Sequence, residues 1–271
     1  MPYKPQVEPQ SAPYCADVKI TGLGDKIGDP VRAAEFPEHV LRFRNERWDK
    51  SIGLGGLDEK QWLDHFGRFD PLPENLDPPL ALRYHGHQFR NYNPEIGDGR
   101  GFLFAQLRDH ENRLMDLATK GSGTTPWSRT GDGKLTLKGG VREILATEML
   151  EALGVDTSKT FSLVETGEKL ERGDEPSPTR SAVMTRLSHS HIRFGTFQRI
   201  AFEKNESLMH QLVVYCLEHY YGGVKTDNPA TELFAKTADK VAQLAGGYMT
   251  AGFVHGVLNT DNMNITGESF D

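Results

Sequence analysis

Cysteine is scarce in this sequence: its 271 residues include only Cys15 and Cys216. Two cysteines exclude a disulfide framework and a zinc site built from cysteines, and this usage is typical of a reducing compartment. Long apolar runs are also missing, because no stretch approaches the roughly 20 residues that a membrane-spanning helix needs. The N-terminal stretch is rich in proline and lacks the apolar core of a signal peptide, so we expect a flexible tail on a cytoplasmic protein.

Positive charge is in deficit, because 31 Lys and Arg residues stand against 38 Asp and Glu residues, for a net charge of −7. This balance disfavours a general nucleic-acid binder, so any affinity for a phosphate ligand must come from a local basic pocket. Hydrophobic residues make up 37% of the chain, which indicates a folded protein with a sizeable core. We expect neither a nucleic acid nor a membrane as partner.

Glycine and proline divide the chain into three parts. Residues 1–80 alternate short helical patterns with proline-rich stretches and show no convergent polar cluster, so we expect an N-terminal extension. Residues 81–185 are predicted to form a β-rich unit with one helix. Glycine-bounded apolar segments predict strands at 101–107, 114–120, 158–166 and 180–188, and helical spacing predicts the helix at 141–154.

Helical periodicity dominates residues 186–271. Two segments, 206–223 and 229–252, carry apolar residues at helical spacing. The predicted stripes are Leu208, Leu212, Cys216 and Tyr220 in the first segment, and Phe234, Ala238, Val241, Ala245 and Tyr248 in the second. Strands with one helix, followed by helices, indicate an α+β fold of two lobes.

Two Asp-Gly elements flank the predicted strands. In "GDGRG", Gly97 and Gly99 would let backbone N–H groups approach an anion, and Arg100 could add a charge-assisted contact to a phosphate. The same string is also a common tight turn. A second "GDG", which contains Asp132 and Gly133, follows a Gly/Ser/Thr loop.

Lys120 ends a predicted strand, where an ammonium can reach into a nucleotide site, although a solvated lysine is the ordinary alternative. Glu143 lies in the first turns of the predicted helix and is placed to pair with Lys120, and Glu148 is its rival on the same helix. Arg186 and Arg193 can converge on one polyphosphate or lie apart on the surface.

Two histidine pairs, His85 with His87 and His189 with His191, have the spacing of metal ligands on a strand. Without cysteine partners or an H-E-x-x-H motif, we expect buried or hydrogen-bonded histidines rather than zinc ligands.

The C-terminal stretch "HGVLNTDNMNITGESFD" concentrates oxygen-bearing side chains. Asp261 is a candidate base, and Asn262 and Asp271 offer oxygen ligands of the kind that Mg²⁺ prefers. The string from His255 to Asn262 is similar to a kinase catalytic loop, although the His-Arg-Asp order is not kept. A plain polar loop is the alternative.

The motifs "YHGHQF", "IGDGRG", "KGSGTTPWSRTGDG", "VREILATEMLEALG", "TRLSHSHIRFGTF" and "GFVHGVLNTDNMNI" occur in this order. Together they closely resemble the selenoprotein O family of kinase-like protein adenylyltransferases, over about residues 84–271. The resemblance implies a two-lobed, protein-kinase-like α+β fold with a β-rich N-lobe and a helical C-lobe. It also implies that ATP binds in reverse and that AMP, rather than the γ-phosphoryl group, passes to Ser, Thr or Tyr hydroxyls of proteins.

The resemblance also assigns roles to individual positions. Asp261 is implied to accept the proton, Glu143 to pair with Lys120, and Asn262 and Asp271 to bind Mg²⁺. The implied nucleotide contacts are Gly97, Gly99, Arg100, Lys120, Asp132, Gly133, Arg186, Arg193 and Asp271.

Some features depart from the family pattern. The strings "LKGGVREI" and "RGDEPSPTRSAV" and the residue Trp127, where tyrosine is usual, put substrate choice and loop shape in question but remove no site residue. Family members run well past residue 271, so we expect this chain to be an N-terminal portion that stops after the catalytic loop. Three alternatives stay open: UMP transfer from UTP with Mn²⁺, ordinary γ-phosphoryl transfer, and a catalytically silent nucleotide-binding fragment.

Overall fold

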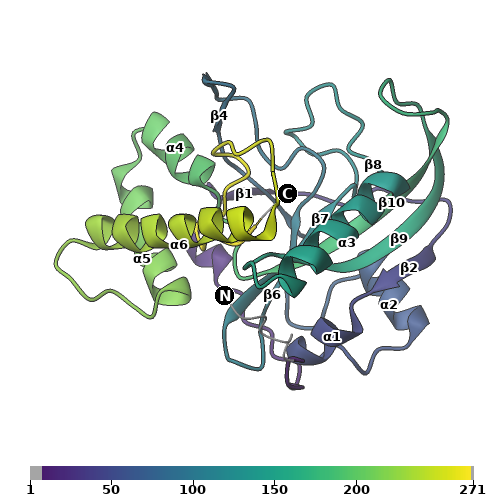
Figure 1. The fold of residues 1–271 in the computed structure, drawn as a ribbon, viewed down its shortest axis with the longest axis horizontal. Helices are drawn as coiled ribbons and strands as arrows, with labels where there is room; N and C mark the ends of the chain where they lie inside the picture. The colour runs from purple at the N-terminus through teal and green to yellow at the C-terminus, as the bar shows by residue number, and fades with distance from the viewer. Residues whose placement is uncertain (1–7, 270–271) are drawn as a thin grey trace.

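The computed structural model describes residues 8–269, and an antiparallel sheet of eight strands forms its centre (Figure 1). The strand order is β1-β3-β6-β7-β10-β9-β2, and β8 pairs with β10. These strands are β1 (Gly28–Pro30), β2 (Val40–Arg44), β3 (Leu80–Leu82), β6 (Leu103–Arg108), β7 (Leu114–Lys120), β8 (Leu135–Thr136), β9 (Lys159–Leu170) and β10 (Thr179–Ser188). A separate hairpin joins β4 (Gly86–Gln88) to β5 (Asn91–Asn93).

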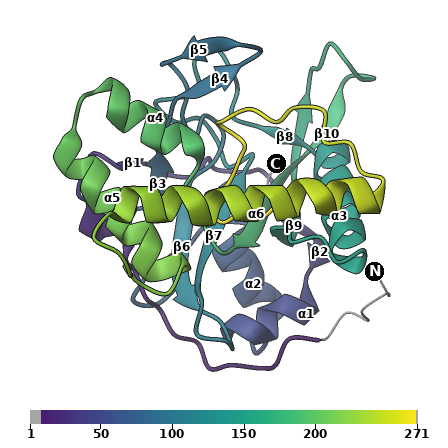
Figure 2. The same ribbon diagram turned by 60° about the vertical axis from the view of Figure 1, so that its left-hand side comes forward.

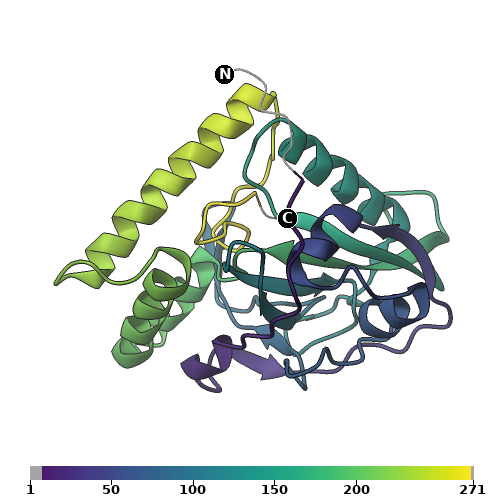
Figure 3. The ribbon, with the colours of Figure 1, turned by 90° about the horizontal axis from the view of Figure 1, so that it is seen from below.

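Six α-helices accompany the strands within these residues, so the predicted α+β class is confirmed. They are α1 (Glu46–Asp49), α2 (Glu59–Phe66), α3 (Leu137–Ala152), α4 (Phe194–Phe202), α5 (Glu206–Tyr220) and α6 (Pro229–Ala251). Two short 3-10 helices cover Ile20–Leu23 and Lys50–Ile52. Helices α4, α5 and α6 gather on one side of the molecule, away from α1 and α2 (Figure 3).

The central strands bury side chains on both of their faces. Along β7, Met115 and Leu117 join one hydrophobic cluster while Leu114 and Ala118 join another, as the two-residue period of a strand requires. The first cluster lies under α1 and α2, and the second receives α4 and α5. A sheet covered on both faces is a rigid base for the loops at the strand ends.

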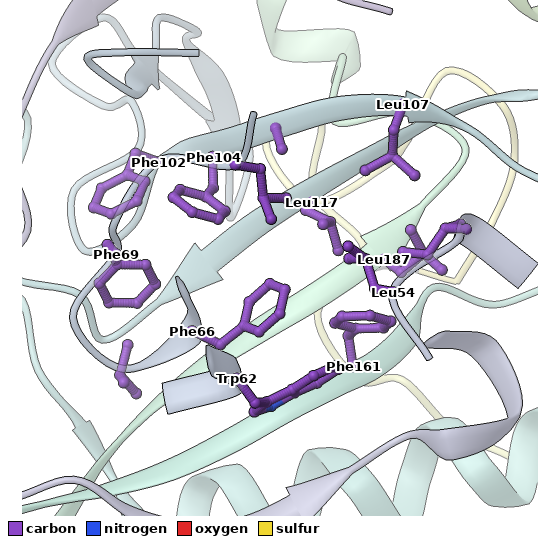
Figure 4. Packing of buried hydrophobic residues seen from close by; sticks show 14 of the residues in the cluster. Leu54, Trp62, Phe66, Phe69, Phe102, Phe104, Leu107, Leu117, Phe161 and Leu187 are labelled. Carbon is purple, nitrogen blue, oxygen red and sulfur yellow. The ribbon is translucent and has the colours of Figure 1, made fainter. Parts of the chain in front are cut away.

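The first 80 residues are built into the sheet. Strand β2 pairs with β9 at one edge, and β1 pairs with β3 near the other. Trp62 and Phe66 of α2 are buried and pack against Phe161 of β9, with ring centroids 5.1 and 5.3 Å away (Figure 4). The sheet therefore crosses the predicted boundary at residue 80, and β2 forms within a segment where the sequence predicts a short helical pattern.

The buried stripe predicted for α5 is confirmed, whereas the one predicted for α6 is confirmed at Tyr248 and wrong at Phe234, Ala238 and Ala245. Phe234 is 76% exposed, and the buried side chains of α6 include Leu233, Thr237, Leu244 and Tyr248. Helix α6 carries apolar residues on two faces, and its contacts with α5 and with the end of α3 select one of them (Figure 2). Within residues 8–269, no helix has the length and apolarity needed to cross a membrane.

Candidate active site

Lys120, Glu143 and Arg186 form a compact charged cluster. Lys120 and Arg186 lie on neighbouring strands, because β7 pairs with β10 so that Ala118 faces Arg186. The Lys120 Nζ atom lies 2.6 Å from Glu143 Oε1, and Arg186 Nε donates to Glu143 Oε2 at 3.1 Å. Both cations are more than nine-tenths buried. Two cations therefore share this one carboxylate.

The rival pairing through Glu148 does not form. Glu148 lies further along α3 and accepts hydrogen bonds from Arg47 and Asn45 instead. Glu143 reaches Lys120 because α3 approaches the sheet closely at Gly140, where a Cβ atom would overlap the Leu163 side chain. The helix begins at the N-cap Thr136, whose hydroxyl accepts a hydrogen bond from the Gly139 N–H at 3.0 Å.

The first glycine loop packs against an aromatic ring. A Cβ on Gly97 would lie 2.6 Å from the Trp127 ring, and one on Gly99 would lie 2.8 Å from the Trp127 carbonyl oxygen, so only glycine fits at either position. Between them, Asp98 Oδ1 lies 2.9 Å from Arg193 Nη1, and the Arg193 guanidinium stacks 4.2 Å from the Tyr84 ring centroid. Asp98 thus fixes an arginine that the resemblance assigns to the nucleotide.

The second Asp-Gly element lies against the loop that follows β7. Gly133 has φ +69° and lies against the backbone of Gly123, so a side chain there would clash. Asp132 pairs with Arg172, whose Nη1 lies 2.8 Å from Asp132 Oδ2. Burial raises the pKa of Asp132, but the Lys134 backbone N–H and the Arg172 guanidinium outweigh it and lower that pKa below its ordinary value.

The loop after α6 holds the candidate base. Asp261 Oδ2 accepts a hydrogen bond from Gln88 Nε2 at 2.9 Å, whereas Oδ1 is buried and has no hydrogen-bond partner among residues 8–269. Asn262 braces the loop, since its Oδ1 accepts from the Asn259 N–H at 2.8 Å and its Nδ2 donates to the Val257 carbonyl at 2.7 Å. Asp271, the predicted second metal ligand and nucleotide contact, lies outside the described residues.

Two adjoining cavities bring most of the predicted residues together. The loop cavity, of about 450 Å³, is lined by Gly97, Gly99, Arg100, Asp132, Gly133 and Asp261, among others. The helix cavity, of about 700 Å³, is lined by Arg100, Lys120 and Glu143. Arg100, Lys134 and Arg172 line both, so the two cavities meet at a cationic border. Arg186 and Arg193 bind Glu143 and Asp98, respectively.

The four histidines of the paired motifs make hydrogen bonds, as expected. His85 Nδ1 lies 2.7 Å from the Tyr92 hydroxyl, and His189 Nδ1 lies 2.8 Å from the Leu114 carbonyl oxygen. His87 and His191 contact Gln198 and Ser188. In the described part of the chain, no group of three or more His, Cys, Asp or Glu residues is placed to hold a metal.

Sequence reasoning missed four residues of this site: Gln88, Asp98, Trp127 as a wall, and Arg172. Asp98 was visible inside "GDGRG", but its partner Arg193 is 95 residues away in the sequence, and nothing local indicates the pair. Gln88 directly follows the "YHGH" string, yet its contact with Asp261 depends on the hairpin fold. An uncharged glutamine also gave no electrostatic signal.

Comparison with known proteins places this geometry in context. A family model described as "Protein adenylyltransferase SelO" matches residues 14–271. Proteins named "Protein nucleotidyltransferase YdiU" from Synechococcus elongatus and Trichodesmium erythraeum are 52% and 51% identical, each over 93% of this chain. A protein of the same name from a Marinomonas species is 39% identical over 73% of the chain. The chain spans about half the length of the first two relatives, 51% and 55%.

Proposed function

Because the chain belongs to the SelO family of protein adenylyltransferases, we propose that it transfers AMP from ATP to Ser, Thr or Tyr hydroxyls of proteins and releases pyrophosphate. The observation that carries this proposal is the charged cluster in which Lys120 and Arg186 share Glu143 at the helix cavity, which adjoins the loop cavity lined by Asp261. In this proposal the sheet with α3 is the N-lobe of a kinase-like fold, and helices α4 to α6 begin its C-lobe.

In this proposal, basic side chains that are held in place and glycine backbone that carries no side chain bind the phosphates. Lys120, Arg186 and Arg193 are buried and held in place by acids, so they need little reorganisation when a polyphosphate enters. Arg100 is exposed at the border of both cavities and can close over the phosphates. Gly97, Gly99 and Gly133 line the loop cavity without side chains, which leaves their backbone open to a ligand. Asp132 lines the same cavity and is also a proposed nucleotide contact.

The acceptor chemistry rests on Asp261. A protein hydroxyl attacks the α-phosphorus, the new O–P bond forms, and the bond from the α-phosphorus to the bridging oxygen breaks, so that pyrophosphate leaves. The hydroxyl proton passes to the Asp261 carboxylate, which lines the loop cavity. The cationic cluster offsets the negative charge on the leaving group.

The oxygen donors of this loop fit a divalent cation. Asp261 Oδ1 is a buried carboxylate oxygen without a hydrogen-bond partner in the described part of the chain, and the adjacent Asn262 carbonyl oxygen accepts only one hydrogen bond there. Mg²⁺ favours such hard oxygen ligands together with phosphate oxygens, so Asn262, with Asp271, would hold it. When bound, the cation supplies charge neutralisation at the phosphates.

Mass spectrometry of a proteome incubated with this protein tests the proposal. We expect AMP adducts on Ser, Thr or Tyr side chains, and none with Asp261→Ala, which should still bind ATP. Parallel reactions with UTP and Mn²⁺ distinguish the nucleotides, because no residue named above reads the base. Adducts of UMP in preference to AMP, or normal turnover by Asp261→Ala, would contradict the proposal.

A further inference from the structure

The β4–β5 hairpin lies directly against the loop that carries Asp261. The His87 backbone N–H donates to the Thr260 hydroxyl at 2.8 Å, and that hydroxyl donates to Gln198 Oε1 of α4 at 2.6 Å. Gln198 Nε2 in turn lies 3.0 Å from His87 Nδ1. These contacts close a ring between hairpin, helix and loop, so the position of β4 relative to Asp261 is fixed by more than one bond.

Strand β4 touches both sides of the Asp261 carboxylate. Gln88 Nε2 donates to Oδ2 at 2.9 Å. On the other side the carboxylate lies against Gly86, where a Cβ atom would come within 2.9 Å of both Asp261 Cβ and Oδ1. Rotation about the last torsion of an aspartate is otherwise broad, so these two contacts select one orientation.

We propose that Gln88 is a positioning residue for the transfer reaction, which holds the Asp261 carboxylate in one orientation at the wall of the loop cavity. This inference rests on the proposed role of Asp261 as proton acceptor. An amide suits the task because it donates a hydrogen bond but carries no charge and no transferable proton at neutral pH. The contribution is to geometry, since the reacting atoms must be held close to their reactive arrangement before the chemical step.

Two substitutions of Gln88 separate a donor role from a packing role. Gln88→Met keeps the length and apolar stem but removes the donor, whereas Gln88→Lys keeps an N–H donor at similar reach. We expect Gln88→Met to lower kcat for AMP transfer about 10- to 100-fold, the usual cost of losing an orienting hydrogen bond to a functional group, with the Kd for ATP within about twofold of wild type. Gln88→Lys should retain more of kcat than Gln88→Met. If the residue only packs, methionine will be tolerated at least as well as lysine.

Gly86→Ala perturbs the same carboxylate from its other side and should also lower kcat without weakening ATP binding. Asn91→Ala is the matched control, because Asn91 is exposed and faces Gln88 in the hairpin register without a side-chain contact to the loop. Thermal melting of each variant verifies that it is folded.

The outcomes distinguish this inference from the proposed function. Absence of AMP transfer by the wild-type protein would remove the proposed function itself. Wild-type transfer that is lost in Asp261→Ala but kept at full kcat in a folded Gln88→Met variant would overturn only the role of Gln88. A loss confined to the Kd for ATP would overturn it as well.

Discussion

Lys120 at the end of β7 and Glu143 on α3 form an ion pair with 2.6 Å between Nζ and Oε1, across 23 residues of sequence. The pair links the sheet to its helix, and Arg186 binds the second oxygen of the same carboxylate. A shift of α3 would therefore displace both cations together. If Lys120 and Arg186 bind the nucleotide as proposed, nucleotide binding is coupled to the packing of α3 through Glu143.

Removal of the lysine charge should weaken nucleotide binding. Lys120→Met is expected to raise the Kd for ATP about 10- to 100-fold, since hydrogen bonds to charged groups contribute about 1.5–3 kcal/mol. Titration of the purified protein with ATP measures this. Glu148→Gln is the control on the same helix, because Glu148 binds Arg47 and Asn45, and it should bind ATP as wild type does. Equal effects of the two substitutions would contradict a specific role for Lys120.

The pair between Asp98 and Arg193 should matter for both stability and binding. Their side chains are 10% and 9% exposed, so Asp98→Asn removes a charge-assisted contact to a buried guanidinium, at a cost of about 1.5–3 kcal/mol. We expect a clear fall in the melting temperature and weaker ATP binding. Asp64→Asn breaks solvent-exposed pairs with Lys60 and Arg68 and should leave the melting temperature unchanged. Similar melting of the two variants would show that the Asp98 pair is not stabilising.

Close approach of α3 to the sheet should depend on Gly140. Gly140→Val places methyl groups where Leu163 is completely buried, so we expect destabilisation of about 1–3 kcal/mol together with loss of ATP affinity as Glu143 moves. Denaturant unfolding and ATP titration report the two effects. On α6, Gly246→Ala meets no atom within 4 Å and should stabilise the protein slightly through helix propensity. A stable Gly140→Val variant with normal ATP affinity would refute the coupling.

The stability of the fold should depend on pH through Glu268. Burial, and next the charge of Asp156, raise the pKa of this carboxyl from 4.5 to about 7. The folded protein therefore holds this proton at pH values where the unfolded chain has lost it. Its stabilising contribution is complete below pH 4.5 and is lost as the pH rises through about 7.

Melting temperatures between pH 5 and pH 8 test this dependence. Glu268→Gln mimics the protonated acid, so it should melt at a higher temperature than wild type at pH 8 and approach it at pH 5. The exposed Glu218→Gln should follow the wild-type curve. A constant difference between Glu268→Gln and wild type across the range would show that Glu268 does not titrate there.

Local patterns were enough to predict the elements that build the site. Strand β7 spans the predicted residues 114–120, and α3 contains most of the predicted helix, because alternation and helical spacing are properties of neighbouring residues. The reach of Glu143 to Lys120 followed from the order of these two elements. The roles in catalysis of Asp261, Asn262 and the arginines stay predictions.

Long-range packing set the features that could not be predicted. The apolar residues of α6 form two stripes, and only contacts with α5 and α3 decide that Leu244 is buried and Phe234 exposed. Strands β1 and β2 are too short for a periodic signal and exist because β3 and β9 offer free edges. Gln88 meets Asp261 across 173 residues, a distance at which sequence spacing carries no information.

Labelled ATP tests the central claim most directly. The protein is incubated with acceptor proteins and ATP that carries the label on either the α- or the γ-phosphorus, and the proteins are then separated from free nucleotide. We predict label on protein from α-labelled ATP alone, with labelled pyrophosphate released from the γ-labelled nucleotide. Transfer of the γ-label to protein would show phosphoryl transfer and contradict the assignment of this site to AMP transfer.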